Sequence, residues 1–157
     1  MPLSTPSDLD FDGRTLVRKL MLAIAIVSFA GMLVSAVSLQ RHYARSATQF
    51  CDFGQQFNCD IVNRSEYSTI AGIPVAGIGV AGYGTLLVLS VFFRRRKEAP
   101  LRVLITACFG LAFALYLTYI EGYVLSTWCI LCLISLAMIF LITALAAIAK
   151  FSKAERS

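Results

Sequence analysis

Two cysteines separated by two residues, Cys129 and Cys132, begin a long apolar run and are the first candidates for chemistry in this sequence. Ser126 and Thr127 precede them and are favourable N-cap residues, so the pattern predicts a helix whose first turn carries both thiols on one face. A helix N-terminus stabilises a thiolate, which is the nucleophile of thiol–disulfide exchange. The spacing therefore favours a redox-active pair, with two buried structural cysteines or half of a metal site as the alternatives.

Three further cysteines, Cys51, Cys59 and Cys108, bring the total to five, and an odd count leaves at least one outside any intramolecular disulfide. Cys51 and Cys59 are close enough in sequence to form a disulfide within one polar stretch. A zinc site of four thiolates is disfavoured because only one pair has the C-x-x-C spacing, so no metal is expected. Cys108 lies within an apolar run and is expected to be a small packing residue outside any relay.

The elements that position these cysteines are apolar. Of the 157 residues, 58% are hydrophobic and 15% are charged, which is too apolar for one soluble domain. A membrane-spanning helix needs about 20 apolar residues, and four runs approach this length, at 20–40, 73–93, 101–123 and 126–149. The sequence predicts an all-α, polytopic membrane four-helix bundle at 16–150, with tails at 1–15 and 151–157 and a large outer loop, 41–72, between helices 1 and 2.

Orientation follows from the basic residues. Of the 14 Lys and Arg residues, all but Arg41, Arg45 and Arg64 lie on one side of the predicted membrane, in the N-terminal flank, the 94–102 loop and the C-terminal tail. The positive-inside rule then places both termini in the cytoplasm and the cysteine loop in the periplasm or outside the cell, where disulfides persist. The net charge of +5 reflects this bias, so no nucleic-acid partner is expected. We expect an integral multi-pass protein of a bacterial inner or plasma membrane, with the endoplasmic reticulum as the alternative.

This topology brings Cys51, Cys59, Cys129 and Cys132 to the outer face. Two dithiol pairs on one face suggest an electron relay by thiol–disulfide exchange. A lipid-soluble quinone is the expected acceptor, because it can enter a pocket among four helices and accepts the two electrons that a dithiol gives. A non-enzymatic membrane scaffold with a structural loop disulfide is the alternative from a different class.

Residues 77–82 match G-x-G-x-x-G, but no strand precedes them and they lie inside a predicted span. The small residues Gly77, Ala81 and Gly84 predict close helix packing instead.

Polar and aromatic residues near the outer face have less specific expectations. Tyr116, Tyr119 and Tyr123 share one helix face, where a pocket for a flat ligand and an aromatic interface belt are both open. Glu121 points to another face of that helix and is expected to be interfacial. His42, the single histidine, is expected to be a solvated interface residue.

Together, several of these residues resemble the vitamin K epoxide reductase (VKOR) family. The resemblance rests on the loop pair Cys51 and Cys59, on Ser65 six residues later, on Gly-Ile-Pro at 72–74 and on the C-x-x-C that begins the last span, and it covers about residues 15–150. DsbB-type proteins also have four spans and two cysteine pairs, but in the reverse order.

The resemblance implies a membrane thiol:quinone oxidoreductase that supports disulfide formation in secreted proteins. Cys51 would exchange with a separate thioredoxin-fold, DsbA-like partner, because this chain ends without the fused thioredoxin-like domain of many bacterial members. Cys59 would pass electrons to Cys129, and Cys132 would attack a ubiquinone, menaquinone or phylloquinone-like quinone. Ser65 would help to hold the loop over the quinone pocket.

The sequence departs from the animal members at two positions of the expected quinone site. Leu136 stands where they have a tyrosine, and Val75 where they have an asparagine. The candidate quinone contacts are therefore Ser65, Val75, Tyr119 and Leu136. A strict vitamin K epoxide or quinone reductase remains the alternative activity.

Overall fold

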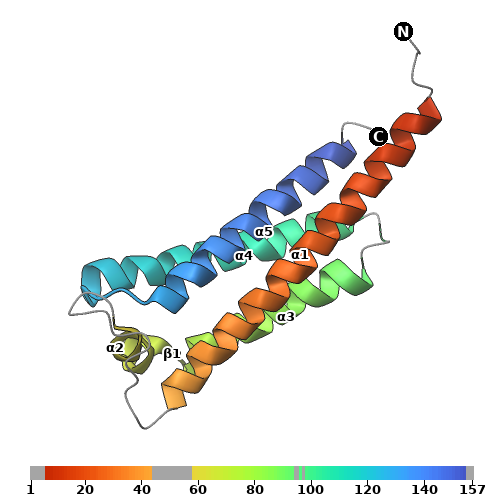
Figure 1. The fold of residues 1–157 in the computed structure, drawn as a ribbon. Coiled ribbons are helices and arrows are strands. Elements are labelled where there is room, and N and C mark those ends of the chain that lie inside the picture. Colours follow the sequence, from red (N-terminus) through yellow and green to blue (C-terminus); the bar gives the residue numbers. More distant parts are fainter. Residues whose placement is uncertain (1–5, 44–57, 94–95, 97, 155–157) are drawn as a thin grey trace.

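The computed structural model describes residues 6–43, 58–93, 96 and 98–154, and its four long helices run up and down in one bundle (Figure 1). These are α1 (Pro6–Tyr43), α3 (Val75–Phe92), α4 (Ala99–Tyr119) and α5 (Ile130–Ala154). Each contains a segment long and apolar enough to cross a membrane. The predicted fold class, an all-α membrane bundle, is confirmed.

Two helices extend into the stretches expected to be tails. α1 begins at Pro6 rather than near residue 16, and α5 continues to Ala154. Proline at a first helical position has its φ angle already set for a helix. Extending a helix that is already formed costs much less than nucleating one. The membrane-spanning helices therefore continue for some residues beyond the apolar runs.

The described part of the 41–72 loop is ordered into short elements rather than an extended polar connection. It contains α2 (Cys59–Arg64), a 3₁₀ turn, η2 (Glu66–Ser68), and strand β1 (Thr69–Ile70). Strand β1 pairs with the antiparallel strand β2 (Ile73–Pro74), which follows the loop and precedes α3. Ala71 and Gly72 connect the strands with φ angles of 51° and 80°. Positive φ at both central residues is typical of the tight hairpin turn, which Gly72 adopts without strain.

These short elements lie at one end of the bundle, called here the capped end. The opposite end, where α1 begins and α5 ends, is called the terminal end (Figure 1). Buried apolar side chains from all four long helices fill the half of the bundle toward the terminal end: Met21, Ile24, Tyr83, Leu86, Ala99, Val103, Ala107, Ile139, Ile142 and Ala146. The filled core therefore leaves the capped half of the bundle to hold the site.

Small residues bring α1 and α3 together. A Cβ atom on Gly31 would overlap the Tyr83 ring, and one on Gly79 would lie 2.9 Å from Ser35 Oγ. At Gly77 and Gly84 the corresponding contacts would be ordinary ones of 3.9 and 4.0 Å. Close packing through small residues is therefore present, but its tightest points are Gly31 and Gly79.

Cys108 does not pack inside the bundle as expected. Its side chain is exposed on α4 beside Phe109, which is 73% exposed. The residues before it on the same helix, Val103 and Ala107, take the inward positions. Cys108 thus lies on the outward, apolar face of its helix.

Candidate functional site: a buried cysteine cluster beside a cavity

The chain between α4 and α5 makes a compact reversal that places the C-x-x-C. α4 ends in a π-helix, η3 (Ile120–Val124), in which the Leu125 N–H donates to the Ile120 carbonyl at 3.0 Å. Ser126 then adopts a φ of 50°, a conformation uncommon for residues other than glycine. Trp128 packs over Gly122, where an added Cβ would lie 3.0 Å from the indole. This reversal brings Cys129 back alongside η3.

Helix α5 begins later than predicted. Its first residue is Ile130, and the Cys129 carbonyl accepts the first helical hydrogen bond, from the Leu133 N–H at 3.0 Å. Cys129 therefore occupies the N-cap position, and the prediction that Ser126 or Thr127 caps this helix is wrong. The Thr127 hydroxyl donates instead to the Leu125 carbonyl. Cys132 lies in the first turn, near the positive end of the helix dipole.

Cys59, at the start of α2, packs directly against this segment. Cys59 and Cys129 are 1% and 0% exposed and share a cluster with Val62 and Cys132. The Cys129 thiol has side-chain hydrogen bonds with both Cys132 and Cys59. The backbone adds a further tie, since the Asn58 N–H donates to the Trp128 carbonyl at 3.2 Å. Three of the four cysteines predicted to be catalytic thus lie together, whereas Cys51 lies outside the described residues.

The surroundings of Cys129 keep its thiol protonated. Its pKa is raised well above the usual value, mainly by the side-chain hydrogen bond with Cys132 and further by burial, while the hydrogen bond with Cys59 acts in the opposite direction. The Cys59 thiol makes its hydrogen bond to Cys129, so the Cys129 sulfur is the one in this pair that a nucleophile at Cys59 reaches most directly.

Glu121 is buried in this cluster, which corrects the expectation that it is interfacial. Its side chain is in the π-helix, is 2% exposed, and accepts a hydrogen bond from the Cys129 N–H at 3.1 Å through Oε2. A second hydrogen bond joins its carboxyl group to the Cys132 side chain. The expectation failed because the reversal after η3, which covers Glu121, has no clear sequence pattern. An ionisable residue within a predicted span is itself a functional signal, and it could have singled out Glu121.

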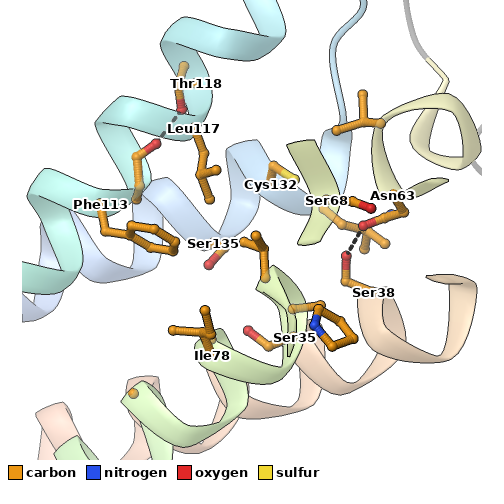
Figure 2. Close-up of a pocket in the computed structure, with 18 of the residues that line it drawn as sticks. Ser35, Ser38, Asn63, Ser68, Ile78, Phe113, Leu117, Thr118, Cys132 and Ser135 are labelled. Carbon is orange, nitrogen blue, oxygen red and sulfur yellow. Dashed lines mark hydrogen bonds between the residues drawn. The ribbon is translucent and has the colours of Figure 1, made fainter. Parts of the chain in front are cut away.

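A cavity of about 380 Å³ opens from this cluster into the capped half of the bundle. Its walls come from all four long helices and from the α2 region, and Cys132 lines it (Figure 2). Most of the lining is apolar, including Ile78 of α3 and Phe113 and Leu117 of α4 (Figure 2). Tyr83 separates the cavity from the filled core, and its hydroxyl donates to the Ser135 carbonyl at 2.8 Å. A mostly apolar cavity with a few polar groups is typical of a site for a small organic molecule.

Two of the four predicted quinone contacts line this cavity and two do not. Ser65 and Val75 are among the lining residues, whereas Tyr119 and Leu136 are not. Helix geometry explains the difference, because Leu117, Thr118 and Glu121 form the inward face of their helix and Tyr119 lies between them in sequence on another face. Leu136 likewise follows Ser135, which faces inward.

The three tyrosines of α4 and η3 face outward together. Tyr116, Tyr119 and Tyr123 are 57%, 59% and 79% exposed, and the rings of Tyr119 and Tyr123 stack with centroids 4.8 Å apart. This exposure favours the aromatic interface belt over the ligand pocket.

Polar groups from α1 and α2 line the cavity near the capped end. Ser38 Oγ donates to Asn63 Oδ1 at 2.9 Å, as Figure 2 shows, and His42 Nδ1 donates to the Asn63 carbonyl at 2.5 Å. His42 therefore holds α2 against α1 and lines the cavity, which differs from the solvated residue that was expected. Ser65 Oγ donates to the Val62 carbonyl at 2.8 Å and stabilises the end of α2.

Asn63 offers a hydrogen-bond donor to this cavity. Its side chain is 7% exposed and lines the cavity, and its Nδ2 has no hydrogen-bond partner within the described structure. Buried polar atoms are nearly always paired, so this amide group is available to a water molecule or a ligand oxygen in the cavity. No sequence motif identified Asn63.

The comparison with protein-family models agrees with this geometry. The vitamin K epoxide reductase family model matches residues 22–147, which include α3, α4, the α2 region and both described parts of the cysteine cluster. No curated protein sequence matches the chain significantly. A match over most of the chain, together with the four spans and the cysteine cluster, settles the family: the chain belongs to the vitamin K epoxide reductase family of membrane oxidoreductases, which couple thiol–disulfide chemistry to quinones.

Proposed function

We propose that this chain oxidises a separate thioredoxin-fold protein on the outer side of a membrane and passes the two electrons to a membrane quinone. Four cysteines carry the electrons, with Cys51 and Cys59 as the outer pair and Cys129 and Cys132 as the helix pair. The observation that carries the proposal is the position of Cys132, which contacts Cys129 within the cysteine cluster and also lines the cavity.

The outer pair receives electrons first. A thiolate of the partner attacks Cys51 in the Cys51–Cys59 disulfide, and the second partner thiol resolves the mixed disulfide, so the partner is oxidised and both cysteines become thiols. The Cys59 thiolate then attacks Cys129 in the Cys129–Cys132 disulfide, and Cys132 leaves. Cys51 attacks Cys59 to restore the outer disulfide, which releases Cys129. The burial of Cys59 against Cys129, with Cys132 on the side of the cavity, supports this direction of attack.

The quinone would occupy the cavity with its ring near Cys132. It supplies a two-electron acceptor whose oxygens take two protons. The apolar lining suits the ring and chain of a quinone, and the Asn63 amide supplies the donor that one quinone oxygen requires. Ser65 supports this arrangement from the second turn of the α2 region, through its hydrogen bond to Val62.

The test is a quinone assay with purified protein, a reduced thioredoxin-fold partner and a soluble ubiquinone or menaquinone analogue. Quinone reduction, followed by absorbance, should require both the chain and the partner. Cys132→Ala should abolish it, whereas the matched variant Cys108→Ala should retain it because Cys108 is exposed on the outward face of α4. Wild-type protein that never reduces a quinone, or Cys132→Ala protein that turns over normally, would refute the proposal.

A second variant tests the proposed quinone contact at Asn63 separately. Asn63→Asp keeps an oxygen acceptor for Ser38 but removes the unpaired Nδ2 donor. Loss of one hydrogen bond of about 1 kcal/mol predicts a KM for quinone at least several-fold higher. Oxidation of the partner at saturating quinone should change much less. An unchanged KM would exclude Asn63 from the quinone site.

A further inference from the structure

Among the described residues of α4 and η3, Glu121 is a carboxyl group inside a predicted span, with 2% of its surface exposed. The described structure contains one salt bridge, between the exposed residues Arg102 and Glu98, so no cation accounts for the burial of Glu121. Burying a carboxyl group costs free energy unless the group is hydrogen-bonded or paired with a charge. Its partners here are the Cys129 N–H and the Cys132 side chain, and it also lines the cavity.

We infer that Glu121 is the proton acceptor for Cys132 when the helix pair gives its electrons to a quinone. This inference rests on the proposed function and adds the group that moves the proton. A thiol must lose its proton to become a nucleophile, and the apolar residues that make up most of the cavity lining cannot accept one. The carboxylate hydrogen-bonded to Cys132 is placed to remove that proton without help from solvent.

Bonds, electrons and protons balance when the helix pair is oxidised by the quinone. The S–H bond of Cys132 breaks and an O–H bond forms on Glu121. The S–H bond of Cys129 breaks as the S–S bond between Cys129 and Cys132 forms, and an electron pair passes to the quinone. The two thiol protons end on the two quinone oxygens, one of them delivered through Glu121. The other titratable groups at this point are Cys59 on α2 and Cys129 at the start of α5, and His42 on α1 lines the same cavity.

The variant Glu121→Gln separates proton transfer from a structural role. A glutamine oxygen still accepts the Cys129 N–H, so the local hydrogen bond survives, but the amide cannot take a proton. Loss of a general base predicts a fall in quinone reduction of about 100-fold or more. The matched control is Glu98→Gln, which changes an exposed glutamate far from the site and should leave the rate unchanged.

A second readout needs no quinone. Alkylation of Cys132 in the fully reduced protein, followed by peptide mass spectrometry, should depend weakly on pH in the wild type because Glu121 removes the proton. In Glu121→Gln the alkylation rate should rise about tenfold per pH unit, because hydroxide must then remove the Cys132 proton. A wild-type rate that already rises tenfold per unit would overturn the inference, even if the variant fails to fold. Normal quinone reduction by Glu121→Gln would overturn it too, while leaving the proposed function intact.

Discussion

At the scale of single residues, the two sulfurs of the C-x-x-C have different surroundings. Cys129 is buried between Cys59 and Cys132 with a raised pKa, whereas Cys132 faces the cavity and Glu121. The first position suits a sulfur that is attacked by a loop thiol, and the second suits a sulfur that meets the acceptor. One turn of helix separates these two environments.

The raised pKa of the Cys129 thiol predicts its reactivity. In the fully reduced protein, alkylation of Cys129 should reach half its maximal rate at a pH above that of an ordinary cysteine, because the fold favours the protonated form. The Cys132→Ala substitution removes the main cause, so the midpoint should fall toward the usual range. Peptide mass spectrometry across a pH series provides the measurement, with Cys108→Ala as the control that should not move it. Equal midpoints in the wild type and Cys132→Ala would contradict the assigned cause.

The candidate redox cysteines could be found from the sequence, whereas the buried polar residues that surround them could not. The spacing of the cysteines predicted a relay and the family resemblance added Ser65; the structure brings Cys59, Cys129 and Cys132 together. Glu121 and Asn63 were missed because their importance comes from burial. That burial depends on a π-helix, a turn with positive φ at Ser126 and the docking of α2 on α1.

At the scale of elements, the α1–α3 contact sets the shape of the cavity. Tyr83 lies across Gly31 of α1 and reaches Ser135 of α5 with its hydroxyl, so one side chain connects three helices and closes the cavity toward the core. The four spans were predictable from hydropathy because the membrane fixes their length. Helix ends were predicted less well, because capping at Cys129 and the reversal before it depend on tertiary contacts.

Gly31→Ala should therefore destabilise the bundle. The added methyl group would meet the Tyr83 ring, which is 5% exposed and held at its hydroxyl. Overpacking of this kind costs about 1–3 kcal/mol. Gly82→Ala is the matched control, because nothing lies within 4 Å of its added Cβ, and helix propensity alone should make it neutral or slightly stabilising. Thermal unfolding in detergent compares the two, and a Gly31→Ala protein as stable as Gly82→Ala would contradict the packing described here.

At the scale of the whole molecule, the bundle is filled toward the terminal end and hollow toward the capped end. Most of the described basic residues lie toward the terminal end, and the cysteine cluster and cavity lie toward the capped end. The described cysteines of the proposed relay and the proposed quinone cavity thus lie at the same end of the bundle.

The positive-inside bias predicts that the capped end faces outward. Two matched single substitutions test this, Glu66→Cys in η2 and Glu98→Cys before α4, since both glutamates are exposed and lie at opposite ends of the bundle. A membrane-impermeant thiol reagent applied to intact cells should label the peptide carrying residue 66 and spare the one carrying residue 98 until lysis. The reverse pattern would invert the topology.

The central claim is that electrons cross from Cys59 to Cys129, and disulfide mapping of Cys132→Ala protein tests it most directly. Without Cys132, no thiol on α5 can resolve the link between the two pairs. Cys129 should then attack Cys59 in the outer disulfide, releasing Cys51 as a thiol. Peptide mapping without reduction should find a Cys59–Cys129 disulfide in Cys132→Ala and not in Cys108→Ala. Finding only Cys51–Cys59, with Cys129 still a thiol during turnover with partner, would contradict the relay and leave the loop bridge as a structural one.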